Sequence, residues 1–204
     1  MKEQLGAAFV AMNLDIGADK EASLLDYLAL LQKWNKTYNL TAIHEPERML
    51  THHLLDSLAI LPQVTADRLL DVGAGAGLPG IPLAIVRPDL AVTLIDASHK
   101  KAAFMQQVAI ELKLANVTAL HGRVEDLDPA TKYPQVVSRA FSDLNDFVRL
   151  TAPLLAEGGE WLAMKGLYPN EEIAQLKGAR VKRDIELHVP GLDADRRLIV
   201  LEVA

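Results

Sequence analysis

Apolar residues in the first 60 positions recur at intervals of three and four, the spacing that places side chains on one face of an α-helix. One helix is indicated by Leu24, Leu28, Leu31 and Trp34. A second is indicated by Met49, Leu54, Leu58 and Leu61. We expect Asp19 to cap the amino end of the first helix and Pro46 to lie in the first turn of the second. Residues 1–62 are therefore predicted to form a helical extension.

From residue 68 onward, short apolar runs alternate with segments of helical periodicity. The expected strands are residues 68–72, 91–96, 117–120, 134–138 and 160–165. The expected helices lie near residues 80–87, 100–114, 142–155 and 169–177. Such alternation is typical of a parallel sheet with helices on both faces.

The end of the chain has a different pattern. Two strand-like runs, 181–189 and 197–203, are separated by residues 190–196 alone, which is too short for a helical crossover. They are expected to form an antiparallel hairpin. The fold class predicted is α/β, a Rossmann-like sheet of five parallel strands plus this C-terminal hairpin, seven strands in all. Residues 63–204 would form this domain and would make one compact unit with the helical extension.

Composition narrows the possible classes of protein. The chain has 204 residues, half of them apolar, and contains no cysteine, so disulfides and thiolate zinc sites are excluded. The sequence contains neither a signal-peptide pattern nor an apolar run long enough to span a membrane, and we expect a cytoplasmic protein. The net charge of −6 means that a nucleic-acid partner would require a local basic patch.

A glycine-rich segment, Asp-Val-Gly-Ala-Gly-Ala-Gly-Leu-Pro-Gly, connects the first expected strand to the next helix at residues 71–80. Glycine tolerates positive φ and lets a ligand approach the backbone, and the N–H groups of such a turn can hold an anion. Gly75, Gly77 and Gly80 satisfy the G-x-G-x-x-G pattern of dinucleotide sites. A dinucleotide site and a purely structural turn are therefore both open alternatives.

Two aspartates at strand ends favour a different ligand. Asp71 precedes the loop at a place where an acid is unfavourable beside a pyrophosphate but suits an ammonium group, such as that of S-adenosylmethionine (SAM). Prolines at the helix start also leave fewer N–H donors for two phosphates. Asp96 ends the second strand about twenty residues after the loop, the spacing of an acid that binds ribose hydroxyls. Asp96 could instead cap the next helix.

Ligands of open α/β sheets bind beyond the carboxyl ends of the strands. Val124 and Glu125 follow the third strand and could offer backbone contacts to an adenine edge. Arg139 and Lys165 end the fourth and fifth strands, where cations are expected to act in catalysis or to pair with Glu125 or Asp143. We expect no metal site, because the adjacent His52 and His53 point to different helix faces.

The sequence resembles the family of small-subunit (16S) ribosomal RNA guanine-N7 methyltransferases, also called glucose-inhibited division protein B. The resemblance extends over nearly the whole chain. It is carried by Trp34-Asn35-Lys36-Thr37-Tyr38-Asn39-Leu40-Thr41, by His53-Leu54-Leu55-Asp56-Ser57-Leu58, by the loop from Asp71 to Pro82, by Ser138-Arg139-Ala140-Phe141 and by Lys165-Gly166.

The resemblance implies SAM as cofactor, S-adenosyl-L-homocysteine as product, and methylation of a guanine in the small-subunit RNA near the decoding centre. The cofactor residues expected from the loop pattern and the resemblance together are Asp71, Gly73, Gly75, Leu78, Asp96, Val124, Glu125 and Arg139. The RNA-binding residues expected are Lys100, Arg123, Arg139, Lys165 and Arg197. The partner would be 16S rRNA, the small ribosomal subunit or an assembly intermediate, and the enzyme a monomer.

Guanine N7 explains why no catalytic base is evident, because N7 carries a lone pair on the neutral base. Alternative functions are SAM-dependent methylation of a protein or small molecule, and SAM binding by a regulatory protein without turnover. A nicotinamide-linked dehydrogenase is disfavoured, because the chain has no second domain to bind a hydride acceptor.

Overall fold

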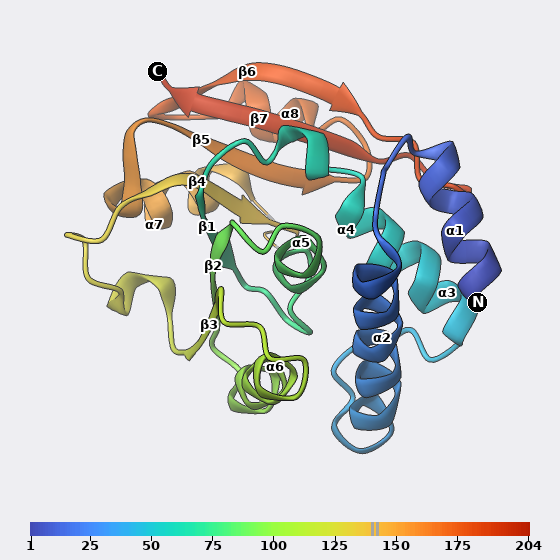
Figure 1. Cartoon of the computed structure of the whole chain (residues 1–204). Coiled ribbons are helices and arrows are strands. Elements are labelled where there is room, and N and C mark those ends of the chain that lie inside the picture. The colour runs from blue at the N-terminus through green and yellow to red at the C-terminus, as the bar shows by residue number, and fades with distance from the viewer. Residues whose placement is uncertain (140, 142) are drawn as a thin grey trace.

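A seven-stranded sheet lies at the centre of the computed structural model, which describes residues 1–139, 141 and 143–204 (Figure 1). The strand order is β3-β2-β1-β4-β5-β7-β6. The strands are β1 (Arg68–Val72), β2 (Ala91–Asp96), β3 (Val117–His121), β4 (Tyr133–Ser138), β5 (Leu155–Lys165), β6 (Ala179–Glu186) and β7 (Arg197–Val203). β1 to β5 are parallel, and β7 runs antiparallel between β5 and β6. The predicted five parallel strands and closing hairpin are confirmed.

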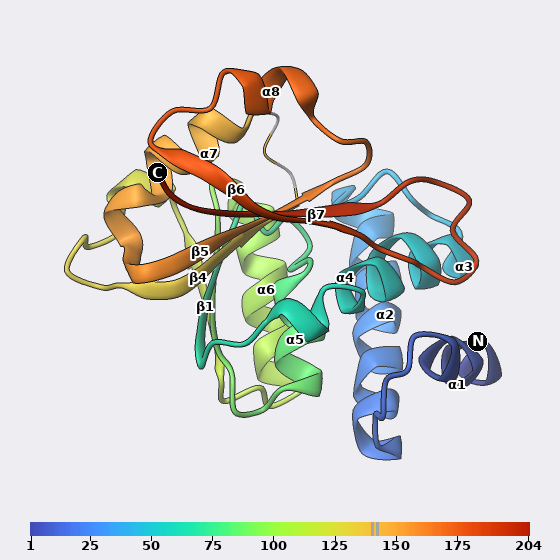
Figure 2. The same ribbon diagram turned by 90° about the horizontal axis from the view of Figure 1, so that it is seen from above.

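Helices cover both faces of the sheet, as the alternation predicted. α5 (Gly80–Val86) and α6 (His99–Glu111) pack on one face, and α7 (Leu144–Thr151) and α8 (Asn170–Ala174) lie on the other (Figure 2). Side chains alternate between the faces along each strand, so Leu69 and Leu70, both fully buried, belong to separate hydrophobic clusters. Three short 3₁₀ turns complete the described elements: η2 (Leu61–Gln63), η3 (Val124–Asp126) and η4 (Ala152–Leu154).

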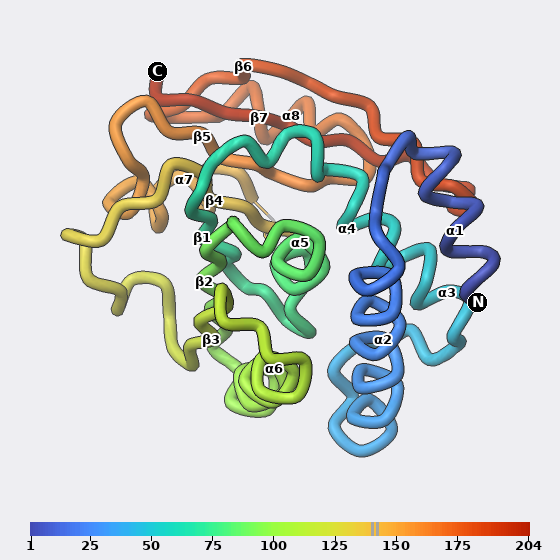
Figure 3. The backbone as a smooth tube through the Cα atoms, viewed as in Figure 1, coloured from blue at the N-terminus to red at the C-terminus, as the bar shows by residue number. Residues whose placement is uncertain are grey.

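The N-terminal extension packs against the face that carries α5 and α6 (Figure 3). It contains α1 (Lys2–Ala11), α2 (Ala18–Tyr38), α3 (Pro46–Met49), the π-helix η1 (Leu50–Leu55) and α4 (Asp56–Leu58). The predicted face of α2 is buried, with Leu24, Leu28 and Leu31 inaccessible to solvent. The fully buried Tyr27 on the same helix donates its hydroxyl hydrogen to the carbonyl oxygen of Ala76 at 2.8 Å. The extension therefore holds the glycine loop directly.

Several predicted boundaries were wrong for local reasons. Gly17, not Asp19, is the cap of α2, because the backbone of Gly17 is extended and its carbonyl accepts the N–H of Glu21. Asp19 instead places an acid in the first turn, near the positive end of the helix dipole. β5 begins five residues early because Leu155 already pairs with Tyr133. α7 is shorter than residues 142–155, whose first position lies outside the described residues, as does Ala140.

The second predicted helix is not a regular α-helix. Its middle turns, Leu50–Leu55, are π-helical, and α-helical turns flank them on both sides. Wide turns of this kind leave carbonyl groups that side chains can reach, and they are frequent at functional sites. The division between residues 62 and 63 stays a prediction. Among the described residues, no helix is long and apolar enough to cross a membrane.

Candidate active site

The glycine loop between β1 and α5 leaves open space at the carboxyl edge of the sheet. Gly73 and Gly75 have φ of 67° and 60°, a region that side chains disfavour. A Cβ atom on Gly73 would meet no other atom within 4 Å. Gly80 has the opposite surroundings, since a Cβ there would collide with Leu94 and approach Asp71 Oδ2 to 2.8 Å. Gly80 thus brings α5 close to the sheet, and Gly73 keeps its own surface accessible.

Asp71 lies beneath this loop and is fully buried. Its Oδ2 accepts the N–H of Gly80 at 2.8 Å, whereas its Oδ1 has no hydrogen-bond partner among the described residues. Burial raises the pKa of Asp71 to about 7, against the opposing effects of the Gly80 hydrogen bond and the Arg139 charge. The unpartnered oxygen is what a ligand ammonium group would stabilise.

Asp96 connects the loop to the next helix. One carboxylate oxygen accepts the N–H of Gly75 at 2.8 Å, and the other accepts the N–H of Ser98, also at 2.8 Å. Ser98 is the N-cap residue of α6, so Asp96 supports the helix start without being its cap. Each carboxylate oxygen has a second lone pair, so Asp96 can still accept ribose hydroxyls. The ribose role predicted for Asp96 is therefore compatible with its geometry, whereas the alternative role as helix cap is wrong, because Ser98 occupies that position.

A cavity of about 280 Å³ opens beside these residues, and we call it the glycine-loop cavity. It is lined by Val72, Gly73, Ile95, Asp96, Ala97, Gly122, Arg123, Val124, Glu125, Phe141 and Leu150. Four predicted cofactor residues, Gly73, Asp96, Val124 and Glu125, therefore meet at one cavity. Asp71, Gly75 and Leu78 do not line this cavity: Asp71 and Leu78 are buried, and Gly75 is a half-buried part of the loop.

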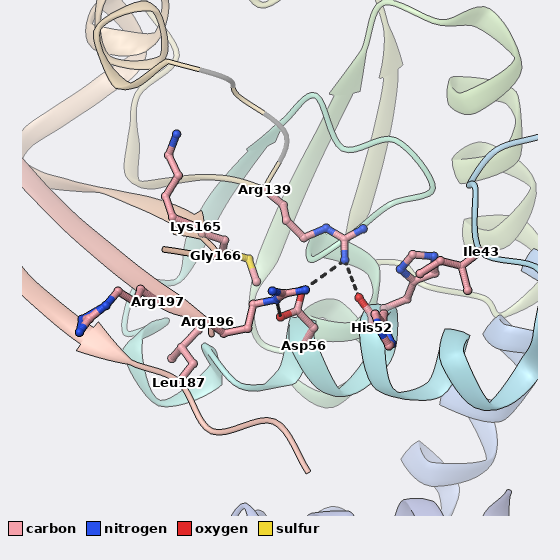
Figure 4. A pocket seen from close by; sticks show the side chains of 11 residues that line it. Ile43, His52, Asp56, Arg139, Lys165, Gly166, Leu187, Arg196 and Arg197 are labelled. Carbon is pink, nitrogen blue, oxygen red and sulfur yellow. Dashed lines mark hydrogen bonds and ion pairs between the residues drawn. The ribbon is translucent and has the colours of Figure 1, made fainter. Parts of the chain in front are cut away.

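A second cavity, of about 360 Å³, lies beyond the ends of β4 and β5, and we call it the arginine cavity (Figure 4). It is lined by Ile43, His52, His53, Asp56, Arg139, Met164, Lys165, Gly166, Leu187, Arg196 and Arg197. Its centre is Asp56, whose Oδ1 lies 3.0 Å from Nε of Arg196 and whose Oδ2 lies 3.4 Å from Nη1 of Arg139. Nη1 of Arg139 also donates a hydrogen bond to the carbonyl oxygen of His52, in the π-helix, at 3.0 Å.

Arg139 was expected among the cofactor residues, but the structure places it outside the glycine-loop cavity. It lines the arginine cavity, and its charge also lowers the pKa of Asp71 beneath the glycine loop, although burial dominates there. The pKa of His53 falls to about 4, chiefly through burial and secondarily through Arg139, so the imidazole is neutral near pH 7. Nε2 of His53 lies 2.8 Å from the hydroxyl of Thr41. The expected partners Glu125 and Asp143 are replaced by Asp56.

Lys165 lies on the arginine cavity, but its ammonium group points away from Arg139 and Asp56 (Figure 4). The ammonium contacts both carboxylate oxygens of Glu172, at 2.8 and 3.0 Å, and the carbonyl oxygen of Phe141 at 3.3 Å. Lys165 therefore ties the segment after β4 to α8. The catalytic role expected for Lys165 stays a prediction, and its contacts in the structure stabilise the fold.

The predicted RNA-binding residues share one edge of the sheet. Lys100 begins α6 and donates to the carbonyl oxygen of Tyr38 at 2.7 Å, and Arg123 is exposed after β3. Arg197 is paired in register with Lys165, so it begins β7 where β5 ends. Its guanidinium contacts both oxygens of Asp184, at 2.9 and 3.0 Å. These residues are spread along the edge from β3 to β7, and carboxylates already pair with Lys165 and Arg197.

Two functional candidates, Asp56 and Arg196, were missed from the sequence. Asp56 stood in a quoted motif without a role, and Arg196 lay in a segment taken as a hairpin turn. The clue available was a buried-helix motif that ends in an acid, His53-Leu54-Leu55-Asp56, because an acid on an apolar helix face requires a partner. Among the described residues, no three His, Asp or Glu side chains are placed to hold a metal ion.

The described residues fit SAM. The glycine-loop cavity offers a carboxylate to ribose hydroxyls, an accessible glycine backbone and the edge formed by Val124 and Glu125. The unpartnered Asp71 Oδ1 supplies negative charge below the loop. A pyrophosphate would instead be repelled by Asp71 beneath the loop, so the dinucleotide alternative fits less well.

Comparisons with known proteins show the family to which the sequence belongs. The family model for rRNA small subunit methyltransferase G matches residues 20–200. The ribosomal RNA small subunit methyltransferase G of Laribacter hongkongensis is 54% identical over 202 residues, covering 98% of each chain. That of Neisseria meningitidis serogroup B is 52% identical, covering 98% of this chain and 97% of its own.

Solved structures show the fold. A SAM-dependent methyltransferase from Aquifex aeolicus has a TM-score of 0.60 at 17% identity, covering 78% of this chain and 94% of its own. Another, from Thiobacillus denitrificans in complex with S-adenosyl-L-homocysteine, has a TM-score of 0.56 at 15% identity, covering 85% and 98%. The predicted fold class and family resemblance are both confirmed, and the chain belongs to the rRNA small subunit methyltransferase G family.

Proposed function

We propose that this chain transfers the methyl group of SAM to N7 of a guanine in small-subunit ribosomal RNA, guanine 527 of the 16S molecule. The observation that carries the proposal is family membership across nearly the whole chain. It is supported by two cavities at the carboxyl edge of the sheet. The glycine-loop cavity would hold the cofactor, and the arginine cavity would receive the target nucleotide.

The chemistry requires little of the protein beyond alignment. SAM would be held at the glycine-loop cavity by Gly73, Asp96, Val124 and Glu125, and it would supply an electrophilic sulfonium methyl group to the N7 lone pair, with S-adenosyl-L-homocysteine as the leaving group. The positive charge moves onto the purine, and no proton has to leave N7. This agrees with a site whose imidazole, His53, is engaged with Thr41 and neutral. Rate enhancement would come from orientation of the two reactants.

RNA recognition would depend on the cations at the carboxyl edge of the sheet. Lys100, Arg123, Arg139 and Arg197 would contact phosphates, while the net charge of −6 disfavours binding elsewhere on the surface. We propose that the enzyme acts as a monomer in the cytoplasm, on 16S rRNA, the small subunit or an assembly intermediate.

The test is methyl transfer from labelled SAM to small-subunit particles that lack the modification, with protein-only extract in parallel. Label mapped to N7 of one guanine in the RNA is the expected result. Label confined to the protein fraction would contradict the RNA substrate while keeping the methyltransferase. SAM binding with no label in any fraction would favour a regulatory protein. Sedimentation equilibrium of the pure chain checks the monomer.

A further inference from the structure

We propose that Asp56 is a positioning residue that holds Arg139 and Arg196 as a pair, so that their guanidinium groups can bind one RNA phosphate beside the target guanine. This inference rests on the proposed function. Arg139 follows β4, Arg196 precedes β7, and Asp56 begins α4 in the N-terminal extension. The carboxylate thus joins three parts of the chain at the arginine cavity (Figure 4).

The burial of Asp56 requires both partners. Its side chain is 4% exposed, against 27% for Arg139 and 26% for Arg196. A carboxylate so far from water is stable only when it is paired and hydrogen-bonded. Each of its two oxygens accepts from a different arginine, at 3.0 and 3.4 Å. Asp56 in turn offsets the repulsion between two guanidinium groups that share one cavity.

The π-helix adds a second anchor for Arg139. The carbonyl oxygen of His52 accepts Nη1 at 3.0 Å, so this nitrogen is fixed by the backbone as well as by Asp56. Arg196 is likewise anchored twice, because its Nη1 donates to the carbonyl oxygen of Asp195 at 2.9 Å. Both side chains are therefore held before any ligand arrives, which reduces the entropy lost on binding.

The charge and the remaining donors indicate the ligand. One carboxylate and two guanidinium groups sum to +1, which one phosphate diester neutralises. Among the described residues, no hydrogen bond engages Nη2 of Arg139 or of Arg196, and paired guanidinium edges match phosphate geometry. Arg197 is different, because Asp184 occupies it through both carboxylate oxygens. Arg139 and Arg196, held by Asp56, are therefore better placed than Arg197 to bind a phosphate.

The experiment compares Asp56→Asn with wild type in kcat and KM for unmodified small-subunit particles, in SAM Kd and binding stoichiometry by calorimetry, and in Tm. Asn preserves the shape but removes the charge that holds the arginines. The matched control is Glu160→Gln. Glu160 also bridges two cations, Lys182 at 2.9 Å and Arg183 at 3.2 Å, but it lies where β5 passes the start of β4, away from the site.

We expect kcat for Asp56→Asn to fall roughly 100-fold, as for a reactant displaced by about 1 Å. KM should change by less than about threefold, because particle affinity is spread over many phosphate contacts. SAM should bind one to one with unchanged Kd. Arg196→Lys, which keeps the charge but loses the planar guanidinium, should lower kcat similarly. Glu160→Gln should keep the wild-type kcat even if its Tm falls.

A double variant tests whether Asp56 acts through its partners. In Asp56→Asn/Arg196→Lys, kcat should fall no further than in the worse of the two single variants, whereas multiplied losses would mean that Asp56 acts independently and would overturn the proposal. If Asp56→Asn keeps the wild-type kcat per SAM-binding site, Asp56 has a merely structural role and the proposal is wrong. If Asp56→Asn does not fold, a wild-type kcat in Arg196→Lys leads to the same conclusion. Absence of RNA methylation by the wild type would instead refute the proposed function.

Discussion

The affinity for SAM should fall as the pH drops below 7, because Asp71 must be ionised to face the ammonium group of the ligand. Asp71 is fully buried beneath the glycine loop, and burial raises its pKa to about 7. A cationic ligand binds the ionised form preferentially, so it must displace a proton from any molecule in which Asp71 is protonated. Protonation of this one carboxyl group thus competes with SAM.

The magnitude follows from the ionised fraction. With a pKa of about 7, roughly half of Asp71 is ionised at pH 7 and roughly a tenth at pH 6, so affinity should weaken about fivefold between them. The ligand's own α-amino group stays protonated there, since such groups titrate at roughly 7.7–8.0. The neighbouring charges are Arg139, which lowers the pKa, and Asp96, which raises it. Tyr27 stays neutral because burial raises its pKa far above this range.

Calorimetric titration of SAM at pH 6.0, 6.5 and 7.0 measures this dependence, with Asp71→Asn as the comparison. The amide oxygen of Asn can still accept the N–H of Gly80, so the start of α5 is kept while the titrating group is lost. The variant should bind more weakly at pH 7 and show no change with pH. A wild-type affinity that does not vary, or an equal slope in both proteins, would refute the role of Asp71.

Three further predictions concern single residues. Because the pKa of His53 is about 4 in the folded protein and 6.5 when unperturbed, its contribution to stability is present above about pH 6.5 and is lost as the pH falls toward 4. Urea unfolding should show that the wild type loses up to about 3 kcal/mol of stability relative to His53→Gln across that pH window. Equal pH dependence in the two proteins would contradict the buried neutral imidazole. Gly80→Ala should lower the free energy of unfolding by about 1–3 kcal/mol through its clash with Leu94, whereas the control Gly6→Ala in α1, with open space around its Cβ position, should stabilise by about 0.4–1 kcal/mol. Lys165→Met and Glu172→Gln should each lower the free energy of unfolding by about 1–3 kcal/mol, because the pair is partly buried, and should reduce methyl transfer alike. Full activity in Glu172→Gln with none in Lys165→Met would mean that Lys165 acts on the RNA directly.

The sheet could be predicted because its signal is local. Short apolar runs, separated by helical periodicity, mark β1 and β2 at the residues where they occur, and the short connection before β7 dictates an antiparallel pair. The glycine loop could also be predicted, because the positive φ of Gly73 and Gly75 depends on residue type at single positions, which the sequence gives directly. The predicted cap at Asp19 failed because an acid in the first turn and an acid at the cap give the same local pattern.

The arginine cavity could not be predicted, because its contacts are long-range. Arg139 and Asp56 are 83 positions apart, and Asp56 and Arg196 are 140 apart. Periodicity placed Leu54 and Leu58 on a buried face, but it gave no sign of the π-helical turns that bring the His52 carbonyl to Arg139. Strand order likewise determines that Arg197 lies beside Lys165, and no sequence pattern reports that register.

The two cavities are built from different parts of the chain. Every residue that lines the glycine-loop cavity lies between positions 72 and 150, in the α/β part of the chain. The arginine cavity also needs Ile43, His52, His53 and Asp56 from the N-terminal extension, together with Arg196 from the hairpin connection. The proposed cofactor site is thus built from the α/β part alone, whereas the proposed RNA site also depends on the N-terminal extension. Substitutions that loosen η1 and α4, but keep the contact of Tyr27 in α2 with Ala76, should impair RNA methylation before SAM binding. In such variants Asp56 is removed from the arginines, while Asp96 keeps its contacts with Gly75 and Ser98.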